Sequence, residues 1–404
     1  MKMPLEGYRV LDWTIWQQGP VASVMLGDLG AEVIKIEERG VGDPSRGTTK
    51  ISGAVTGLAG RNFYFENCNR NKRSIAINLR KPKGKEIIYK LVEKSDVFVQ
   101  NFRQGVAARQ SLDYTTLSKY NPRLIYASAS GWGAEGPGAE RPSYDYTGMA
   151  RSGIMNMVGE PGMPPMAIRG GICDQLGAVM TAYGVVTALL VRERTGIGQE
   201  LDASLLGGMT WLQGLNVAMK LIMGTEIPRE VRATARNPLW NHYKCKDGKW
   251  IVLAHLQSDR QWPTLCHAMG MQDLEKDPRF NSGEARSKNA AELIVVMDRI
   301  FATKTQEEWL KTLAATGDLI AEPVNTVSDL VVDPQAIANG YIRDFQHPVW
   351  GPIKVVGPPI KFSKTPAAPQ REAPEFGQHT EEILNEILGY SWDEITKLKN
   401  EEII

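Results

Sequence analysis

Histidine is scarce in this chain, and its distribution limits the possible chemistry. The 404 residues include five histidines, and none lies in the first 241 residues. Zinc hydrolases often place two histidines four residues apart on one helix, so that both side chains reach the metal. No such spacing occurs among His242, His255, His267, His347 and His379. The sequence therefore predicts a site without a metal, in which any histidine comes from the later part of the chain or from another chain.

Cysteine is also rare. Cys68, Cys173, Cys245 and Cys266 are dispersed and form no C-x-x-C pair. Because closely paired cysteines mark zinc sites and closely spaced sets mark disulfide frameworks, we expect neither here. Reduced thiols are typical of intracellular proteins, so we expect a cytoplasmic location.

Long apolar runs and an excess of one charge are missing as well. No uninterrupted run approaches the roughly 18 apolar residues of a membrane-spanning helix, and the first residues lack the apolar stretch of a secretory signal. We therefore expect no transmembrane helix and no membrane partner. Lys and Arg number 47 against 46 Asp and Glu, a net charge of +1. Because nucleic-acid-binding proteins usually carry a basic excess, we expect no nucleic-acid partner, although a local pocket for one phosphorylated ligand fits this balance.

Strand-like and helix-like patterns alternate along the first 130 residues, which is typical of a parallel sheet with crossover helices. The expected strands are 8–13, 33–37, 74–78, 96–100 and 124–128, and the expected helices are 20–29 and 82–93. The sequence therefore predicts an α/β fold.

The pattern changes after residue 128. Residues 129–171 are rich in Gly, Pro and Met and predict a long functional loop region, followed by a buried helix at 174–194. Residues 201–204 are expected to enter a further helix. Asp247-Gly248 between two apolar runs predicts a β-hairpin. Later helices are expected at 258–269, 288–302, 305–315, 379–388 and 391–400.

The length favours two domains. We expect residues 1–221 to form the first part of a large domain and residues 222–335 to form a smaller α+β domain with its linkers. Residues 336–404 are then expected to return to the large domain.

Three motifs allow both a functional and a structural interpretation. Residues 131–136 match G-x-G-x-x-G, but Pro137-Gly138 follows where a dinucleotide site needs a helix, which favours a flexible glycine loop. The basic residues near the expected strand ends could bind phosphates or be solvated surface charge. Asp174, at the start of the apolar helix, could be the helix N-cap or a nucleophile kept ionised by the helix N-terminus.

Five separated motifs, in the same order, resemble those of class III coenzyme A transferases, the relatives of formyl-CoA and carnitine CoA transferases. They are Val10–Glu37, Asn71–Ile75, Asn101-Phe102-Arg103, Asp174 with Arg192–Gln199, and Phe376–Leu384. The resemblance runs from residue 4 to the C-terminus.

The resemblance implies a Rossmann-like large domain, a smaller α+β domain and a dimer of two chains threaded through each other like linked rings. It implies that Asp174 is the nucleophile that takes the acyl group from an acyl-CoA and then becomes an aspartyl-CoA thioester. It places Gln17 near the reaction centre. Six positions match CoA contacts of the family: Ile77, Arg80, Asn101, Phe102, Arg109 and Tyr144. We also expect the nearby basic residues Lys72, Arg73 and Arg39 to bind CoA. No tightly bound cofactor is expected, because coenzyme A enters as the substrate thioester.

Departures from the family pattern concern the acceptor acid. Formyl-CoA enzymes carry a glycine-rich loop where this chain has Arg236–Asn241, so an acyl group larger and more apolar than oxalate is favoured. The sequence of residues 13–18 is similar to the corresponding sequence of transferases for aromatic succinates that use succinyl-CoA.

Three alternatives stay open. An acyl-CoA racemase or epimerase of the same fold would need a histidine where this chain has Ser143-Tyr144-Asp145-Tyr146. The chain could instead be a non-catalytic subunit of a heteromer with a homologous subunit, rather than part of a homodimer, although Asp174 argues against that. It could also recycle CoA for a partner dehydratase.

Overall fold

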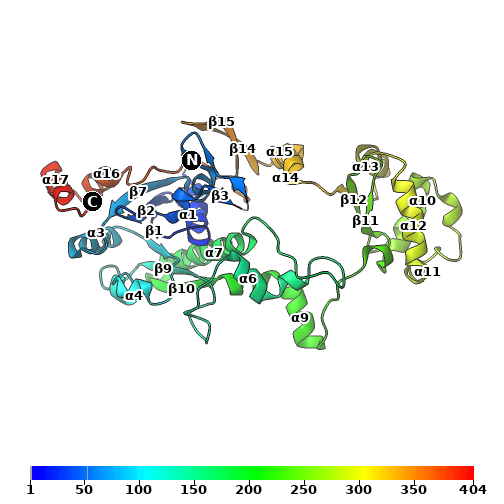
Figure 1. Cartoon of the computed structure of the whole chain (residues 1–404), viewed down its shortest axis with the longest axis horizontal. Coiled ribbons are helices and arrows are strands. Elements are labelled where there is room, and N and C mark those ends of the chain that lie inside the picture. Colours follow the sequence, from blue (N-terminus) through cyan, green and yellow to red (C-terminus); the bar gives the residue numbers. More distant parts are fainter. Residues whose placement is uncertain (1, 52) are drawn as a thin grey trace. The chain divides into compact units, whose positions relative to one another are not determined.

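The structure is a computed structural model that describes residues 2–51 and 53–404. Its centre is a six-stranded sheet in which every neighbouring pair is parallel, in the order β10-β9-β8-β1-β2-β7 (Figure 1). The strands are β1 (Arg9–Trp13), β2 (Glu32–Glu38), β7 (Lys72–Ile77), β8 (Val97–Gln100), β9 (Ile125–Ser130) and β10 (Gln199–Ser204). The predicted α/β class is confirmed.

Each face of the sheet has its own apolar core, because successive strand residues point to opposite sides. Leu11 faces the core that includes α3, α16 and α17, whereas Val10 faces the core that includes α1 and α7. The bounds of these helices are α1 Gln18–Asp28, α3 Pro82–Glu93, α7 Ile172–Thr195, α16 Thr380–Glu386 and α17 Trp392–Asn400. Helices therefore cover both faces, which explains why the inner strands are almost continuously buried.

The strand order creates a crevice at one edge of the sheet. The chain leaves β1 toward β2 on one side, while β8 pairs with β1 on the other side. The loops that follow β1 and β8 therefore diverge at the carboxyl ends of these two strands, where open α/β sheets bind their ligands.

Two expectations for the middle of the chain are wrong. Residues 199–204 form the edge strand β10, which pairs with β9 over six residues, and only then does α8 (Leu205–Leu212) begin. A strand this polar is stable because it lies at the sheet edge. The segment 129–171 is not all loop, since it contains α6 (Asp145–Ser152).

Helix α7 bears on the expectation that the chain contains no segment apolar enough to span a membrane. In the described part of the chain it alone is long and apolar enough, by length and composition, to cross a membrane. Scattered Gly, Thr and Tyr residues hid this in the sequence, because no apolar run is uninterrupted. The helix packs against α1, β9 and β10, and the core helix of a folded domain has the same composition.

The C-terminal segment closes the outer edge of β7. The Ser74 N–H donates to Nδ1 of His379 over 3.1 Å, and the Ala76 N–H donates to Oγ1 of Thr380 over 3.0 Å. These side chains take the place of a neighbouring strand, so the edge is not left open. The predicted pair of final helices is present as α16 and α17.

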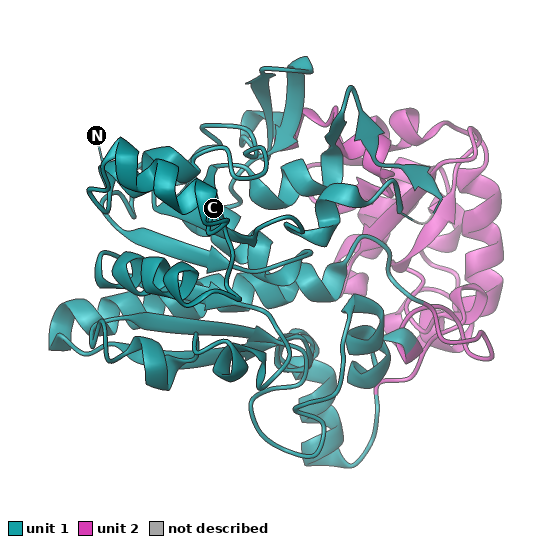
Figure 2. Ribbon diagram, turned by 60° about the vertical axis from the view of Figure 1, so that its left-hand side comes forward, with its two compact units in different colours: residues 1–155, 167–226, 337–404 teal, residues 156–166, 227–336 magenta. Residues whose placement is uncertain are grey.

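Residues 156–166 and 227–336 form a second, smaller compact unit, and the remaining described residues form the larger one (Figure 2). The predicted hairpin is present as β11 (Trp240–Lys244) and β12 (Trp250–Ala254), joined by β13 (Ala321–Pro323) in an antiparallel sheet. The unit has its own core with α10 (Ser258–Met269), α12 (Ala290–Phe301) and α13 (Gln306–Ala314).

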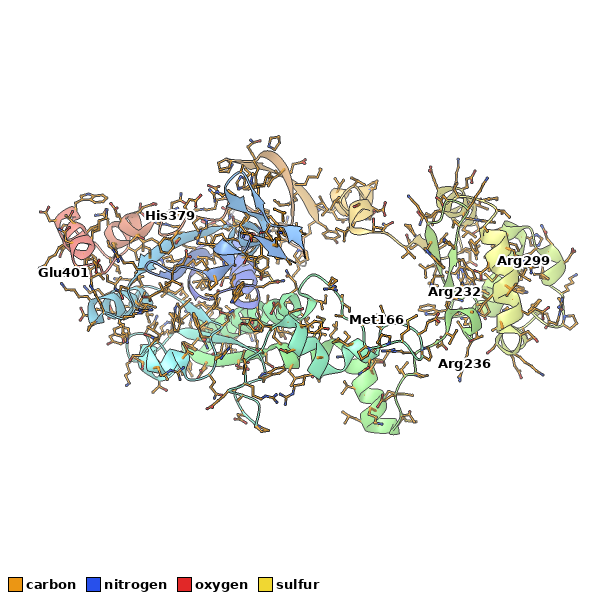
Figure 3. All side chains as sticks on the ribbon, in the orientation of Figure 1. Met166, Arg232, Arg236, Arg299, His379 and Glu401 are labelled. Atoms are coloured by element: carbon orange, nitrogen blue, oxygen red, sulfur yellow. The ribbon has the colours of Figure 1, made fainter. Side chains whose placement is uncertain are left out.

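A bidentate ion pair fixes the start of this smaller unit. Arg232, labelled in Figure 3, donates to both carboxylate oxygens of Asp298, over 3.0 and 2.6 Å. The pair holds the segment that precedes β11 against α12.

Two ion pairs lie fully buried beneath the carboxyl end of β1. Lys72 Nζ lies 2.6 Å from Oδ2 of Asp12, and Lys35 Nζ lies 2.9 Å from Oδ2 of Asp43. Lys72 also donates to the carbonyl oxygens of Pro20 and Cys68 and to Oδ1 of Asn69. All its donors are therefore used inside the fold.

We expect Lys72→Ala to lower the free energy of unfolding by about 3–5 kcal/mol, because it leaves the Asp12 carboxylate buried without a counter-charge. Urea unfolding at neutral pH measures this loss. Lys354→Ala removes an exposed lysine paired with Asp344 and should change the free energy by less than about 1 kcal/mol. Equal effects from the two substitutions would contradict the structural role given to Lys72.

Candidate active site

A cavity of ≈ 720 Å³ opens at the carboxyl edge of the sheet, where the strand order predicts a crevice. Its walls come from the loops after β1, β8 and β9, from the start of α7 and from β10, all in the larger unit. Of the sequence-predicted site residues it brings together Gln17, Asn101, Phe102, Arg109, Tyr144 and Asp174.

Asp174 lies in the first turn of α7 but is not its N-cap. The cap position is Gly171, in a left-handed conformation with φ of 71°, and Asp174 is the third helical residue. Its carboxylate makes no hydrogen bond or ion pair with any described residue, and the side chain is half-buried at the cavity. The helix therefore positions a carboxylate that remains free to react.

Asp145 performs the capping that the sequence suggested for Asp174. From the first turn of α6, its Oδ1 accepts the N–H groups of Cys173 over 2.7 Å and Asp174 over 3.2 Å. Burial, together with the nearby charge of Asp145, raises the pKa of Asp174 to about 7. The expectation that the helix N-terminus keeps Asp174 ionised is therefore wrong, since a second carboxylate already occupies that N-terminus.

Gln17 contacts the backbone that precedes Asp174. Its Nε2 lies 3.4 Å from the carbonyl oxygen of Gly171, and its Oε1 accepts the Tyr64 hydroxyl over 3.4 Å. A Cβ on residue 171 would come within 2.4 Å of the Gln17 amide, and the residue carrying it would have to adopt a φ of 71°, so glycine favours this approach. The loop after β1 and the start of α7 thus meet at Gln17.

Asn101 and Phe102 shape the wall next to this loop. The Asn101 side chain accepts from the Ile15 N–H over 2.9 Å and donates to the Ile15 carbonyl over 2.7 Å. Phe102 packs on Trp13 with ring centroids 4.3 Å apart. The loops after β1 and β8 are therefore locked together by one amide side chain.

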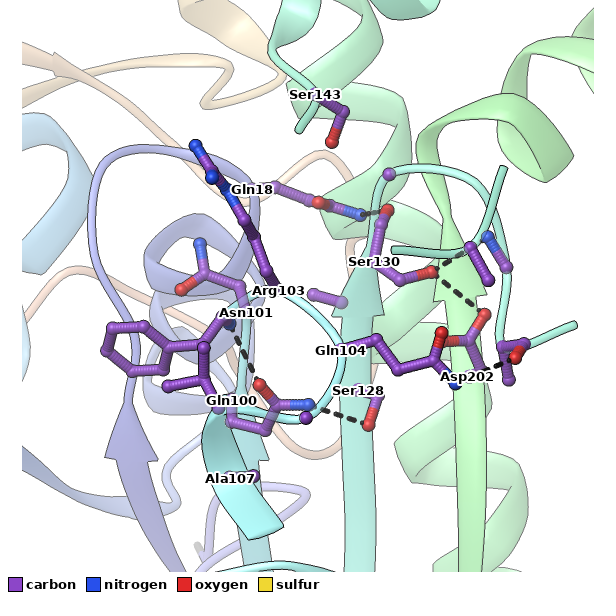
Figure 4. Close-up of a pocket in the computed structure, with 18 of the residues that line it drawn as sticks. Gln18, Gln100, Asn101, Arg103, Gln104, Ala107, Ser128, Ser130, Ser143 and Asp202 are labelled. Carbon is purple, nitrogen blue, oxygen red and sulfur yellow. Dashed lines mark hydrogen bonds between the residues drawn. The ribbon is translucent and has the colours of Figure 1, made fainter. Parts of the chain in front are cut away.

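The floor of the cavity is polar. Figure 4 shows Gln100 donating to Ser128, Ser130 donating to Asp202, and Gln18 reaching the Ser130 carbonyl. Burial raises the pKa of Asp202. Around this floor, Arg109 and Tyr144 are exposed at the mouth of the cavity and are free to meet a ligand.

The other predicted CoA contacts do not line the cavity. Lys72 is in the core, with its donors used as described above. Arg73 bridges Glu32, Glu382 and Glu386 and so ties the C-terminal segment to the sheet. Ile77 is buried, Arg80 is exposed near Glu38, and Arg39 donates to the carbonyl of Ile404.

Two residues at the site were missed as functional residues. Asp145 was quoted only as part of a stretch that lacks a histidine, and Tyr64 carried no motif. Only the tertiary structure reveals that Asp145 accepts the Asp174 N–H and that the Tyr64 hydroxyl donates to Gln17. Burial and the charges of Cys68 and Asp174 together raise the pKa of Tyr64. The G-x-G-x-x-G run contributes Gly131 and Gly133 to the cavity, and the next helix begins only at Asp145.

A family model described as CoA-transferase family III matches residues 5–380. The chain belongs to CoA-transferase family III. The resemblance drawn from the motifs is therefore confirmed, and the enzyme acts on CoA thioesters and carboxylic acids.

Relatives with assigned activities cover nearly the whole chain of this CoA-transferase. The succinyl-CoA:glutarate CoA-transferase of Mus musculus is 35% identical over 398 residues, covering 98% of this chain and 89% of that protein. The succinyl-CoA–D-citramalate CoA-transferase of Chloroflexus aurantiacus is 32% identical, covering 99% and 98%. A CaiB/BaiF family protein of Brucella suis has a similar structure, with a TM-score of 0.83, 31% identity and coverage of 96% of this chain and all of that one.

The Asp145→Asn substitution tests the electrostatic pairing at this CoA-transferase site. The nucleophilic role that the motif resemblance implies for Asp174 requires the ionised carboxylate, so with its pKa raised to about 7 we expect the rate to fall as the pH drops through that value. Asparagine keeps an oxygen that caps α7 but removes the charge, so it should lower the pKa of Asp174 and move the acid limb of log(kcat/KM) to lower pH.

The control is Asp202→Asn, because Asp202 lines the same cavity but is not among the groups that raise the pKa of Asp174. Its acid limb should stay in place. An unmoved limb in the Asp145 variant would show that burial alone sets this pKa.

Proposed function

We propose that this CoA-transferase moves CoA from succinyl-CoA to a carboxylic acid larger than oxalate, through a covalent intermediate on Asp174. The observation that carries the proposal is the free carboxylate of Asp174, which is half-buried, has a raised pKa and faces a cavity large enough for the reacting end of a thioester. A desolvated carboxylate with a raised pKa is a stronger nucleophile than one in water.

The transfer proceeds in four balanced steps. The Asp174 carboxylate attacks the thioester carbonyl of the donor, and the C–S bond breaks to give a mixed anhydride and CoA thiolate. The thiolate attacks the aspartyl carbonyl, releasing the donor acid and leaving an aspartyl-CoA thioester. The acceptor carboxylate then attacks this thioester and releases the thiolate again. Finally the thiolate attacks the acceptor carbonyl, which gives the new acyl-CoA and regenerates Asp174.

Gln17 is suited to orient this centre. Its amide nitrogen, held only weakly at 3.4 Å from the Gly171 carbonyl, can donate to an oxygen that becomes negative during each attack. Tyr64 fixes which end of the amide faces Gly171, because its hydroxyl donates to the amide oxygen.

Coenzyme A fits the cavity with its thioester at Asp174 and its pantetheine arm past Asn101 and Phe102. Arg109 and Tyr144 at the mouth then meet the nucleotide end, and Arg80 and Arg39 follow β7 and β2 at the same carboxyl edge. Ile77 ends β7 with its side chain buried, so the proposal leaves it out. The proposal no longer includes Lys72 and Arg73, because the structure gives both of them partners within the fold.

The choice of donor and acceptor rests on relatives. Those from Mus musculus and Agrobacterium fabrum are named for succinate and glutarate, and both are matched over 96% or more of this chain. Formyl-CoA:oxalate enzymes of Rhodopseudomonas palustris are also similar, at 30% identity, but Arg236–Asn241 lacks the glycine-rich loop of that activity.

We also propose a dimer of interlocked chains, either of two copies of this chain or with a homologous subunit. Support comes from helices α8 and α9 (Gly214–Met223), which expose large apolar side chains. Trp211, Leu215 and Leu221 are each 78–79% exposed in the single chain, and a partner chain would cover them.

Asp174→Asn tests the nucleophile. The substitution keeps the size of the side chain and touches no cap, so the melting temperature should stay within a few degrees of wild type while CoA transfer falls by at least about a thousandfold. Mass spectrometry of wild type treated with succinyl-CoA and hydroxylamine should find one modified residue, Asp174. A folded variant with near-wild-type turnover, or a label on another residue, would contradict the covalent mechanism.

Arg109→Ala tests the position of CoA. A contact to the nucleotide end is equal in the ground and transition states, so KM for the CoA ester should rise roughly ten- to hundredfold while kcat changes little. The rise should be the same with succinyl-CoA and acetyl-CoA. The control is Arg123→Ala, which should leave KM unchanged. Arg123 is an exposed arginine just before β9, at the opposite edge of the sheet. A rise of KM with only one of the two donors would show that Arg109 contacts the acyl group rather than the nucleotide.

A further inference from the structure

We propose that Trp16 is the residue that selects the acceptor acid, and that it favours carboxylic acids with a large apolar or aromatic body. The inference rests on the proposed transfer through Asp174 and adds the substrate class to it. It is carried by the conformation, exposure and anchoring of this one side chain.

The backbone of Trp16 is in a conformation that tryptophan rarely adopts. Its φ is 66°, one of five positive values found for non-glycine residues in the described part of the chain. For a bulky residue this is a strained, left-handed conformation. Such strain tends to be retained at ligand clamps and active sites, where the surroundings fix it.

The surroundings of Trp16 do fix it, through bonds on both sides. Its own N–H donates to Oδ1 of the buried Asp43 over 3.2 Å. The Ile15 backbone is held at both its N–H and its carbonyl by Asn101, and the Thr14 carbonyl accepts from Lys35 over 3.0 Å. Three side chains therefore hold residues 14–16 in this arrangement: Lys35 in β2, Asp43 in the loop after β2, and Asn101 directly after β8.

The result of this anchoring is an aromatic ring that faces the cavity. Trp16 is 36% exposed and lines the cavity together with Ile15 and Gln17. Its indole N–H makes no hydrogen bond with the described residues. The floor nearby is polar, so the indole gives a ligand a large apolar surface that the floor does not offer.

The position of Trp16 points to the acyl group rather than to the nucleotide. Its neighbour Gln17 lies against Gly171, three residues before Asp174. An acyl group bonded to Asp174 must place its body within a few ångströms of this junction. An acid with a ring or a branched chain would be able to pack on the indole, whereas a small acid would leave most of it uncovered.

The test compares acceptors that differ only in an aromatic substituent. Purified full-length enzyme is given succinyl-CoA with either glutarate or 3-phenylglutarate, and kcat/KM for each acid is measured for wild type, Trp16→Ala and Trp16→Phe. Trp392→Ala is the matched control, since Trp392 is also exposed but lies at the start of α17.

We expect Trp16→Ala to lower kcat/KM about ten- to hundredfold for 3-phenylglutarate, the factor for losing an aromatic partner, and less than about threefold for glutarate. Trp16→Phe keeps a ring and should lie between wild type and Trp16→Ala. Trp392→Ala should match wild type with both acids.

Three results would overturn the inference. Wild type could strongly prefer glutarate, or Trp16→Ala could leave kcat/KM for 3-phenylglutarate unchanged. Equal losses of kcat/KM with both acids would mean that Trp16 only shapes the loop that carries Gln17. The aspartyl-CoA adduct formed from succinyl-CoA alone is measured in parallel by mass spectrometry. If wild type forms no adduct, the proposed function fails; if the adduct forms but the acceptor preference is unaltered, only the role of Trp16 fails.

Discussion

The ion pair between Lys35 and Asp43, fully buried beneath the carboxyl end of β1, is the interaction on which the site depends most. Asp43 accepts the N–H of Trp16, and Lys35 donates to the carbonyl of Thr14, so one pair fixes the loop that carries Gln17. Burying two charges is expensive unless further hydrogen bonds are made, and here Ser45 donates both its N–H and its hydroxyl to Oδ1 of Asp43.

The second buried pair extends this support to the first helix. Lys72 joins Asp12 to the carbonyl of Pro20 in the first turn of α1, and Thr14 donates its hydroxyl to Asp12. The amino end of α1 and the loop before it therefore share one charged framework. This framework fixes the backbone that carries Gln17, whose own side chain makes only long contacts of 3.4 Å.

The raised pKa of Asp174 follows from its burial and from an arrangement of two carboxylates. Asp145 takes the N–H groups that would otherwise stabilise the charge of Asp174, and at the same time it repels that charge. A helix N-terminus alone would have made Asp174 a weaker base. The same helix thus presents a carboxylate that is both exposed to substrate and costly to ionise, which suits a nucleophile that must form and release an acyl bond.

The sequence by itself determined the α/β class, most strand and helix positions and the family, because apolar periodicity and ordered motifs are local properties of the chain. It did not reveal β10, since a polar edge strand has no apolar pattern. It also could not separate Lys72 from Arg109: both are cations near strand ends, yet one is inside the core and the other is at the cavity mouth. Which donors are already used, and which carboxylate caps α7, depends on contacts between residues far apart in the chain, and only the tertiary structure decides these.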